Sequence, residues 1–116
     1  MYNQRIGKIG EDYVSTYLQE RDYEIVYRNY RAKKGEIDII AKQNSGYIFV
    51  EVKTRTNQKY GSAAEAVTPK KQALLRDTAQ LFLIDKNLSD VDMRFDIAEV
   101  YLKNNKLEIH YIKNAF

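Results

Sequence analysis

Cysteine and tryptophan are absent from this 116-residue chain, which also holds only one proline and one histidine. Without cysteine, disulfides, zinc–thiolate centres and thiol nucleophiles are excluded. No apolar run approaches the roughly 20 residues that span a membrane. The first residues, Met1 to Arg5, lack the apolar core of a signal peptide. We therefore expect a protein with no membrane partner and a cytoplasmic location.

The residues that are present describe a globular protein, with 44% apolar and 30% charged side chains. The length predicts a single domain over residues 1–116. The net charge is only +3, but between Lys53 and Arg76 six bases accompany one acid, Glu65. This asymmetry hints at a face that binds a polyanion. On charge alone, an ordinary solvated basic surface is the simpler explanation.

The spacing of apolar residues predicts two helices and five strands. Three- and four-residue spacing indicates a helix over residues 6–21. Thr68 before Pro69 is typical of a helix start, and that helix should end near Lys86. Residues 54–67 are expected to form a loop. Alternating or β-branched runs predict strands over residues 24–31, 36–42, 47–53, 93–102 and 106–113.

The hairpin between the second and third predicted strands brings two acids together. If its turn centres on Asn44 and Ser45, Asp38 lies opposite Glu51 on one side of the sheet. Carboxylates in that position have Cβ atoms about 4.5–5.5 Å apart and repel each other. A raised pKa on one acid or a divalent cation would offset the repulsion. A turn longer by one residue would instead send the two acids to opposite faces.

The same register places Glu36 opposite Lys53, beside the two acids. Oxygen ligands suit Mg²⁺ or Mn²⁺, and a neighbouring lysine can position or deprotonate water or neutralise developing charge. This is the outline of a metal-assisted phosphodiester hydrolysis site. An E-x-K sequence on a strand is more often a solvated pair, but apolar residues flank both acids, which favours a functional site near the core.

Five segments together carry a resemblance to a known family. They are I-G-K-I-G-E (6–11), G-E-I-D-I-I-A (35–41), F-V-E-V-K-T-R (49–55), Y-G-S-A-A-E-A-V-T-P-K-K-Q (60–72) and R-F-D-I-A (94–98). The chain resembles the YraN-like family of small bacterial proteins. That family looks like a branch of the restriction-endonuclease-like PD-(D/E)xK superfamily, close to archaeal Holliday junction resolvases. The resemblance implies an α/β fold: a restriction-endonuclease-like αβββαβ core with a mixed central sheet flanked by helices.

The resemblance also implies roles for particular residues. Asp38 and Glu51 would hold Mg²⁺ or Mn²⁺, with Glu11 supporting the metal site, and Lys53 would be the catalytic lysine. Ile37 stands where the superfamily has proline, a frequent variation. The candidate substrate-contacting residues are Arg55, Tyr60, Lys70, Lys71 and Gln72.

Three hypotheses of function follow. The leading one is a metal-dependent DNA endonuclease, with branched DNA such as Holliday junctions as a candidate substrate. The alternative is a non-catalytic nucleic-acid-binding module that retains the nuclease fold. A third is a structural interaction protein in which the acids and Lys53 form salt bridges.

A homodimer is a further hypothesis, because cutting two strands symmetrically calls for two sites. Arg94 and Asp96 are expected to form a structural pair, and His110 to be structural.

Overall fold

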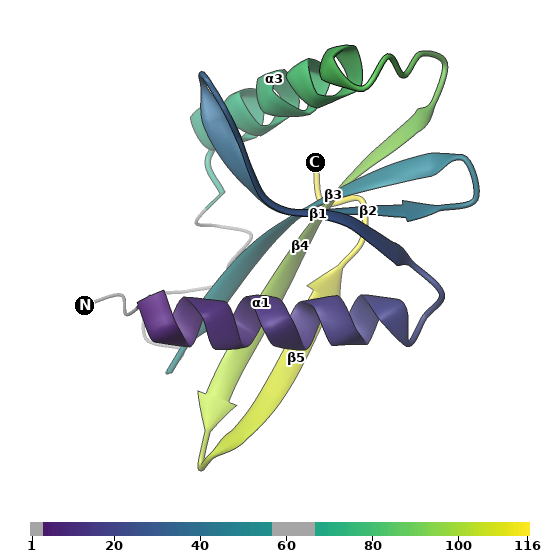
Figure 1. Cartoon of the computed structure of the whole chain (residues 1–116). Coiled ribbons are helices and arrows are strands. Elements are labelled where there is room, and N and C mark those ends of the chain that lie inside the picture. Colours follow the sequence, from purple (N-terminus) through teal and green to yellow (C-terminus); the bar gives the residue numbers. More distant parts are fainter. Residues whose placement is uncertain (1–3, 57–66) are drawn as a thin grey trace.

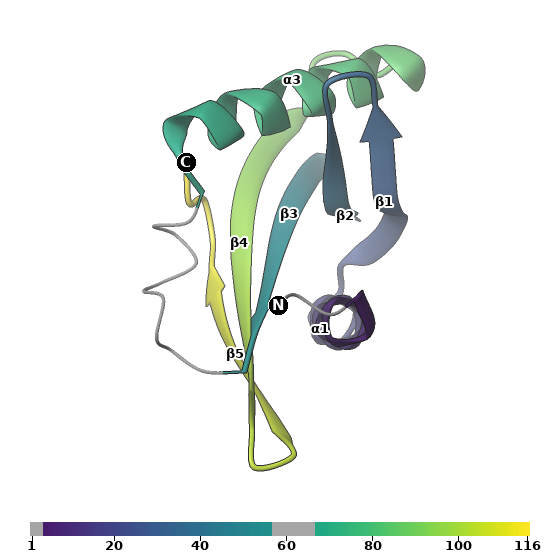
Figure 2. The same ribbon diagram turned by 90° about the vertical axis from the view of Figure 1, so that its left-hand side faces the viewer.

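Five strands form one mixed sheet in the order β1-β2-β3-β4-β5, and two helices flank it (Figures 1 and 2). This arrangement comes from a computed structural model, which describes residues 4–56 and 67–116. Neighbouring strands are antiparallel, except for the parallel pair β3 and β4 at the centre. The elements are α1 Gln4–Gln19, β1 Glu24–Ala32, β2 Gly35–Gln43, β3 Gly46–Arg55, α3 Pro69–Asp85, β4 Asp92–Lys103 and β5 Lys106–Ile112.

The predicted fold class and the predicted order of elements are confirmed. Strand limits agree within two residues, but α1 ends at Gln19 rather than at the expected residue 21. It ends there because Asp22 adopts a left-handed conformation (φ 67°), and the Leu18 carbonyl accepts hydrogen bonds from the N–H groups of Arg21 and Tyr23. Within the predicted loop, residues 54 and 55 continue β3, and 57–66 lie outside the described residues.

The sheet is buried on both faces, which explains why its central strands are apolar in almost every position. One cluster of buried side chains lies beneath α3 and centres on Phe82, whose ring contacts Tyr30, Tyr47 and Phe49. The other lies beneath α1 and includes Val14. Among the described residues, no helix is long and apolar enough to cross a membrane.

The helix α1 approaches β3 closely at Gly10. A methyl group at this position would overlap the Thr54 side chain, so the approach requires a glycine. The second glycine of the I-G-K-I-G-E segment therefore sets how near α1 lies to β3.

The turn between β2 and β3 has the predicted register. Ladder pairs run from Gln43–Gly46 to Ile39–Val50, and Asn44 in the turn has a φ of 56°. Asparagine tolerates this left-handed conformation better than most residues. The register therefore brings Asp38 and Glu51 to the point where the β2–β3 ladder ends.

Candidate functional site

The site opens where β2 and β3 separate. Beyond the Ile39–Val50 pair, the Val52 N–H donates its hydrogen bond to a side chain instead of to the backbone of β2. The acceptor is Oδ2 of Asp38, at 2.8 Å. From there the β1–β2 hairpin and the far half of β3 run in different directions (Figures 1 and 2). An open pocket of about 380 Å³ lies at this point.

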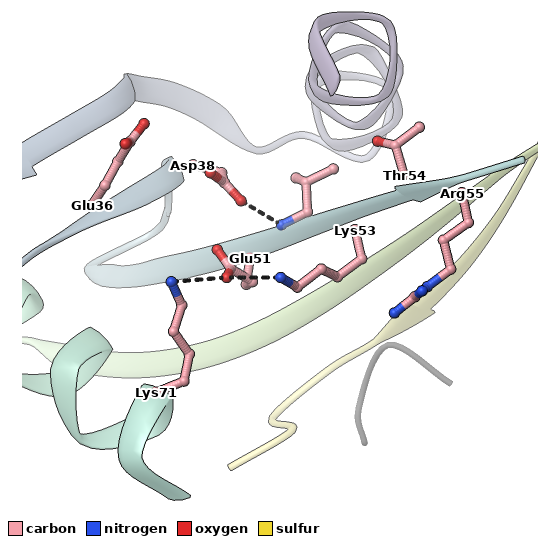
Figure 3. Close-up of a pocket in the computed structure, with 8 residues that line it drawn as sticks. Glu36, Asp38, Glu51, Lys53, Thr54, Arg55 and Lys71 are labelled. Atoms are coloured by element: carbon pink, nitrogen blue, oxygen red, sulfur yellow. Dashed lines mark hydrogen bonds and ion pairs between the residues drawn. The ribbon is translucent and has the colours of Figure 1, made fainter. Parts of the chain in front are cut away.

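Three elements supply the polar lining of this pocket, which Figure 3 shows in close-up. Asp38 comes from β2, Glu51 from β3 and Lys71 from α3. Glu36, Asp38, Glu51 and Lys53 all line this pocket. The predicted cross-strand pairs Asp38–Glu51 and Glu36–Lys53 are not part of the β2–β3 ladder, because it ends at Ile39–Val50. The charged lining residues are Glu36, Asp38, Glu51, Lys53, Arg55 and Lys71.

Asp38 and Glu51 form an acid pair held partly out of water. Glu51 is only 5% exposed. Burial raises the pKa of Asp38 from 3.8 to about 9, and the negative charge of Glu51 and a hydrogen bond with its carboxyl act in the same direction. The hydrogen bond from the Val52 N–H opposes this shift. At neutral pH, the metal-free pair therefore retains a proton on Asp38.

Two lysines face the Glu51 carboxylate from different elements. The ammonium groups of Lys53 and Lys71 lie 3.7 Å and 3.5 Å from its Oε2 atom. The predicted partner of Lys53, Glu36, instead pairs with Arg31 at 3.4 Å. Lys53 therefore stands next to the second acid of its own strand, as an E-x-K arrangement requires.

The first turn of α3 positions Lys71. Thr68 is the N-cap as predicted: its Oγ1 accepts a hydrogen bond of 3.2 Å from the Lys71 N–H, and Pro69 follows it. The Gln72 side chain donates to the Val67 carbonyl at 3.1 Å, so it secures the start of the helix. Lys70 points into solvent.

The remaining predicted site residues lie at different distances from the acid pair. Arg55 lines the pocket, and its buried Nε has no hydrogen-bond partner among the described residues. Glu11 lies in a neighbouring hollow, where it pairs with Arg28 at 3.5 Å, although its charge still contributes to the raised pKa of Asp38. Tyr60 lies outside the described residues.

The donor set fits a hard divalent cation. Across residues 4–56 and 67–116, no three acidic or histidine side chains converge as a ready metal cage. Asp38, Glu51 and, further along β2, Glu36 offer carboxylate oxygens to the pocket. A cation bound at Asp38 and Glu51 could replace the proton that their pairing favours. Mg²⁺ is typically bound by one or two carboxylates, with water and phosphate oxygens completing its shell.

Sequence reasoning missed one buried acid beside the site, Glu99. It is 2% exposed and is the cross-strand neighbour of Lys53. It accepts a hydrogen bond of 2.7 Å from the Tyr101 hydroxyl and lies 3.0 Å from Nδ1 of His110. Its signal was an acid inside an apolar run, the same signal that marked Glu51.

The expected structural pair on β4 is confirmed. Arg94 donates two hydrogen bonds to the fully buried Asp96, at 2.9 Å and 2.8 Å. The Tyr111 hydroxyl and the Asn114 N–H also donate to Asp96, at 2.6 Å and 2.8 Å. The carboxylate is thus satisfied by structural partners, and these contacts join β4 to β5 and to the C-terminal residues.

Comparisons with known proteins find a family model and several relatives along nearly the whole chain. Residues 10–100 match the model of the family described as "Uncharacterised protein family UPF0102". A UPF0102 protein from Caldicellulosiruptor saccharolyticus is 43% identical over 118 residues, covering 100% of both chains. One from Alkaliphilus metalliredigens is 46% identical over 111 residues, covering 96% of each. One from Clostridioides difficile is 43% identical over 116 residues, covering 100% of each. The segment matched by the family model includes every residue of the pocket.

Proposed function

The chain belongs to the uncharacterised protein family UPF0102, and from the geometry of its site we propose that it is a metal-dependent endonuclease that hydrolyses phosphodiester bonds in DNA. The proposal places Mg²⁺ or Mn²⁺ at Asp38 and Glu51, with Lys53 beside them. It also places the chain in the PD-(D/E)xK nuclease superfamily, which its sequence motifs resemble.

The observation that supports this proposal most strongly is the costly arrangement of the two acids. Asp38 and Glu51 share a partly enclosed pocket at the end of a strand ladder, where burial and the nearby charge of Glu51 raise the pKa of Asp38. The two lysines beside Glu51 and the Val52 N–H beside Asp38 do not remove the cost of placing one acid next to the other, because the pKa of Asp38 stays raised. A divalent cation would allow Asp38 to ionise beside Glu51, so a metal site explains why the two acids lie together.

The bound cation would activate a water molecule and stabilise negative charge on the phosphate. Two lysines of the chain would orient the water and bind the phosphate. The Lys53 ammonium, 3.7 Å from Glu51, is placed to orient the attacking water and to neutralise charge as the water oxygen bonds to phosphorus. Lys71, on the opposite side of Glu51, is placed to contact a phosphate oxygen. The phosphorus–oxygen bond to the leaving strand would then break, and the leaving oxygen would gain a proton to replace the bond. The attacking water gives up one proton in the same reaction, so the step consumes one water molecule and balances.

A cleavage assay tests this function directly. Purified protein is incubated with labelled four-way junctions, flaps, single strands and plain duplex, in Mg²⁺, Mn²⁺ or EDTA. We expect cutting that requires the metal and is lost in Lys53→Ala, which also serves as the control for contaminating nucleases. The preferred substrate would show whether branched DNA is recognised. Cutting that persists unchanged in Lys53→Ala would contradict the assignment.

A second candidate, a non-catalytic nucleic-acid-binding module, is favoured by a different observation. Lys53 and Lys71 already compensate the charge of Glu51 without a cation. This candidate predicts salt-sensitive DNA binding that is indifferent to Mg²⁺ and to Glu51→Gln. The nuclease proposal predicts that Glu51→Gln abolishes both Mg²⁺ binding and cleavage.

A further inference from the structure

We propose that the hollow between α1 and β1 binds the sugar-phosphate backbone of the substrate strand, on one side of the phosphate to be cut. This inference rests on the proposed function, because it extends the substrate path beyond the candidate site. It assigns a binding role to Lys8 and Arg31, two cations that the hydrolysis chemistry does not use.

The hollow continues directly from the candidate site. Its volume is about 570 Å³, and Glu36 lines both this hollow and the pocket of Asp38 and Glu51. A strand whose phosphate lies at the acid pair therefore has an adjacent depression to enter. The charged and polar residues that line the hollow are Lys8, Glu11, Arg28, Asn29, Arg31 and Glu36.

Two arginines of β1 line the same hollow. Arg28 and Arg31 are three residues apart, so strict alternation along a strand would place them on opposite faces. Between them, Asn29 has a left-handed φ of 54°. Asn29 and Asp38 fall between the ladder pairs Arg28–Ile39 and Tyr30–Ile37. The left-handed residue Asn29 thus lies at the register position of Asp38, whereas the register shift of β1 lies between Ile25 and Tyr27.

The cations of the hollow differ in how firmly they are held. Arg28 is tied to α1, with 2.7 Å to Asp12 and 3.5 Å to Glu11. Arg31 and Lys8 have side chains 81% and 75% exposed, in ion pairs of 3.4 Å and 3.9 Å with Glu36 and Asp12. Exposed pairs of this kind contribute little, so a phosphate can replace the carboxylate at small cost.

The chemistry of the lining selects the ligand. None of the described residues that line the hollow carries a large apolar side chain that could hold an apolar small molecule. It offers Lys8 and Arg31 as phosphate contacts, and Arg28 has a buried Nε with no hydrogen-bond partner among the described residues. Because the hollow is contiguous with a site built for a phosphodiester, the next phosphates of the same strand are the ligand that fits it.

The test compares two double variants that remove equal charge. Lys8→Ala/Arg31→Ala alters the hollow, whereas Lys106→Ala/Lys113→Ala removes two exposed lysines from the region of β5. Affinity for a fluorescent single-stranded DNA is measured in EDTA over a range of salt concentrations, so the readout does not depend on cleavage. Circular dichroism and thermal unfolding establish that both double variants fold.

We expect the variant of the hollow to bind DNA several-fold more weakly at low salt. The slope of log affinity against log salt should fall by about 1.4, since each lost phosphate contact on a single strand contributes about 0.7. The β5 variant should keep the wild-type slope. These results would support the inference even if the protein did not cut DNA. A lack of cutting would count against the nuclease proposal alone.

A second measurement locates the contacts along the strand. Single methylphosphonate substitutions, which remove one phosphate charge each, should weaken wild-type binding at positions on one side of a central region. The variant of the hollow should be insensitive at those same positions. The inference would be overturned if wild type and the variant of the hollow had equal affinity, equal salt slope and the same interference pattern. In that case the proposed function still stands if the wild type cuts DNA. Failure of the wild type to bind any DNA would overturn both.

Discussion

At the residue scale, the state of the Asp38 carboxyl distinguishes this site from an ordinary surface cluster. An exposed aspartate would be ionised at neutral pH, whereas burial and Glu51 hold the pKa of Asp38 at about 9 in the folded chain. The unfolded chain has the ordinary value of 3.8. Between these two values, the folded chain binds a proton that the unfolded chain has released.

The stability of the metal-free protein should therefore fall as the pH rises from about 4 to about 9. The unfolded state binds fewer protons in this range, so the Asp38 contribution to the free energy of unfolding decreases as the pH rises. Asp38→Asn removes the titration while its side-chain oxygen can still accept from the Val52 N–H. Urea unfolding in EDTA at pH 5 to 8 measures this. Identical pH slopes for wild type and Asp38→Asn would show that Asp38 does not hold the proton.

Lys71 leads to a prediction with opposite effects on binding and catalysis. Its ammonium lies 3.5 Å from Glu51, where it competes with a cation for the same carboxylate. Lys71→Ala should tighten Mn²⁺ binding by about three- to tenfold, as expected for losing a partly exposed charge. It should slow single-turnover cleavage, because a phosphate contact is lost.

Isothermal titration with Mn²⁺ and single-turnover kinetics measure the two effects. Lys70→Ala is the control for metal affinity, since Lys70 occupies the same helical turn but points into solvent. Equal metal affinity in the two variants would mean that Lys71 does not act on Glu51.

At the scale of elements, the position of α1 against β3 depends on one glycine. Gly10→Ala would bring a methyl group into the Thr54 side chain. Overpacking of this kind costs about 1–3 kcal/mol. That exceeds the roughly 1 kcal/mol that alanine gains over glycine inside a helix. We expect a net loss of stability in chemical denaturation.

The double variant Gly10→Ala/Thr54→Ala provides the control. The Thr54 hydroxyl is buried without a hydrogen-bond partner among the described residues, so its removal breaks no hydrogen bond. The double variant should be more stable than the sum of the two single effects predicts. Strict additivity would mean that the two side chains do not meet.

The elements themselves could be predicted from the sequence because their signals are local. Thr68 and Pro69 set the start of α3, and the turn at Asn44 set the register of β2 against β3. The end of α1 could not be placed, because Asp22 rather than a glycine adopts the left-handed conformation that terminates it. The left-handed conformation of Asn29 could not be predicted either, since the residues around it keep the pattern of a strand.

At the scale of the whole molecule, the site depends on contacts between distant segments. Simple register arithmetic brought Asp38, Glu51 and Lys53 together, since all three lie on one hairpin. The contact of Lys71 with Glu51 depends on how α3 packs on the sheet, which no local pattern determines. The partner of Glu36 also differed from the prediction, because Arg31 on β1 is its cross-strand neighbour.

Assembly is a further prediction at this scale. A chain of 13.6 kDa covers little of a duplex, and two symmetric cuts need two sites. We expect light scattering to give twice the mass of one chain, either alone or with branched DNA. A monomer under both conditions would contradict the dimer hypothesis and leave the hydrolysis site unaffected.

The central claim is that the Asp38–Glu51 pair is retained for metal-dependent chemistry at the expense of stability. Asp38→Asn separates these two properties in one variant. The most direct measurement is cleavage of labelled DNA at pH 8 in Mg²⁺ by wild type and Asp38→Asn, with thermal unfolding of both samples in EDTA. We predict that the variant unfolds several degrees higher, since unfolding no longer releases a proton from this position, and that it does not cut. A variant that cuts at the wild-type rate would contradict the account, whatever its stability.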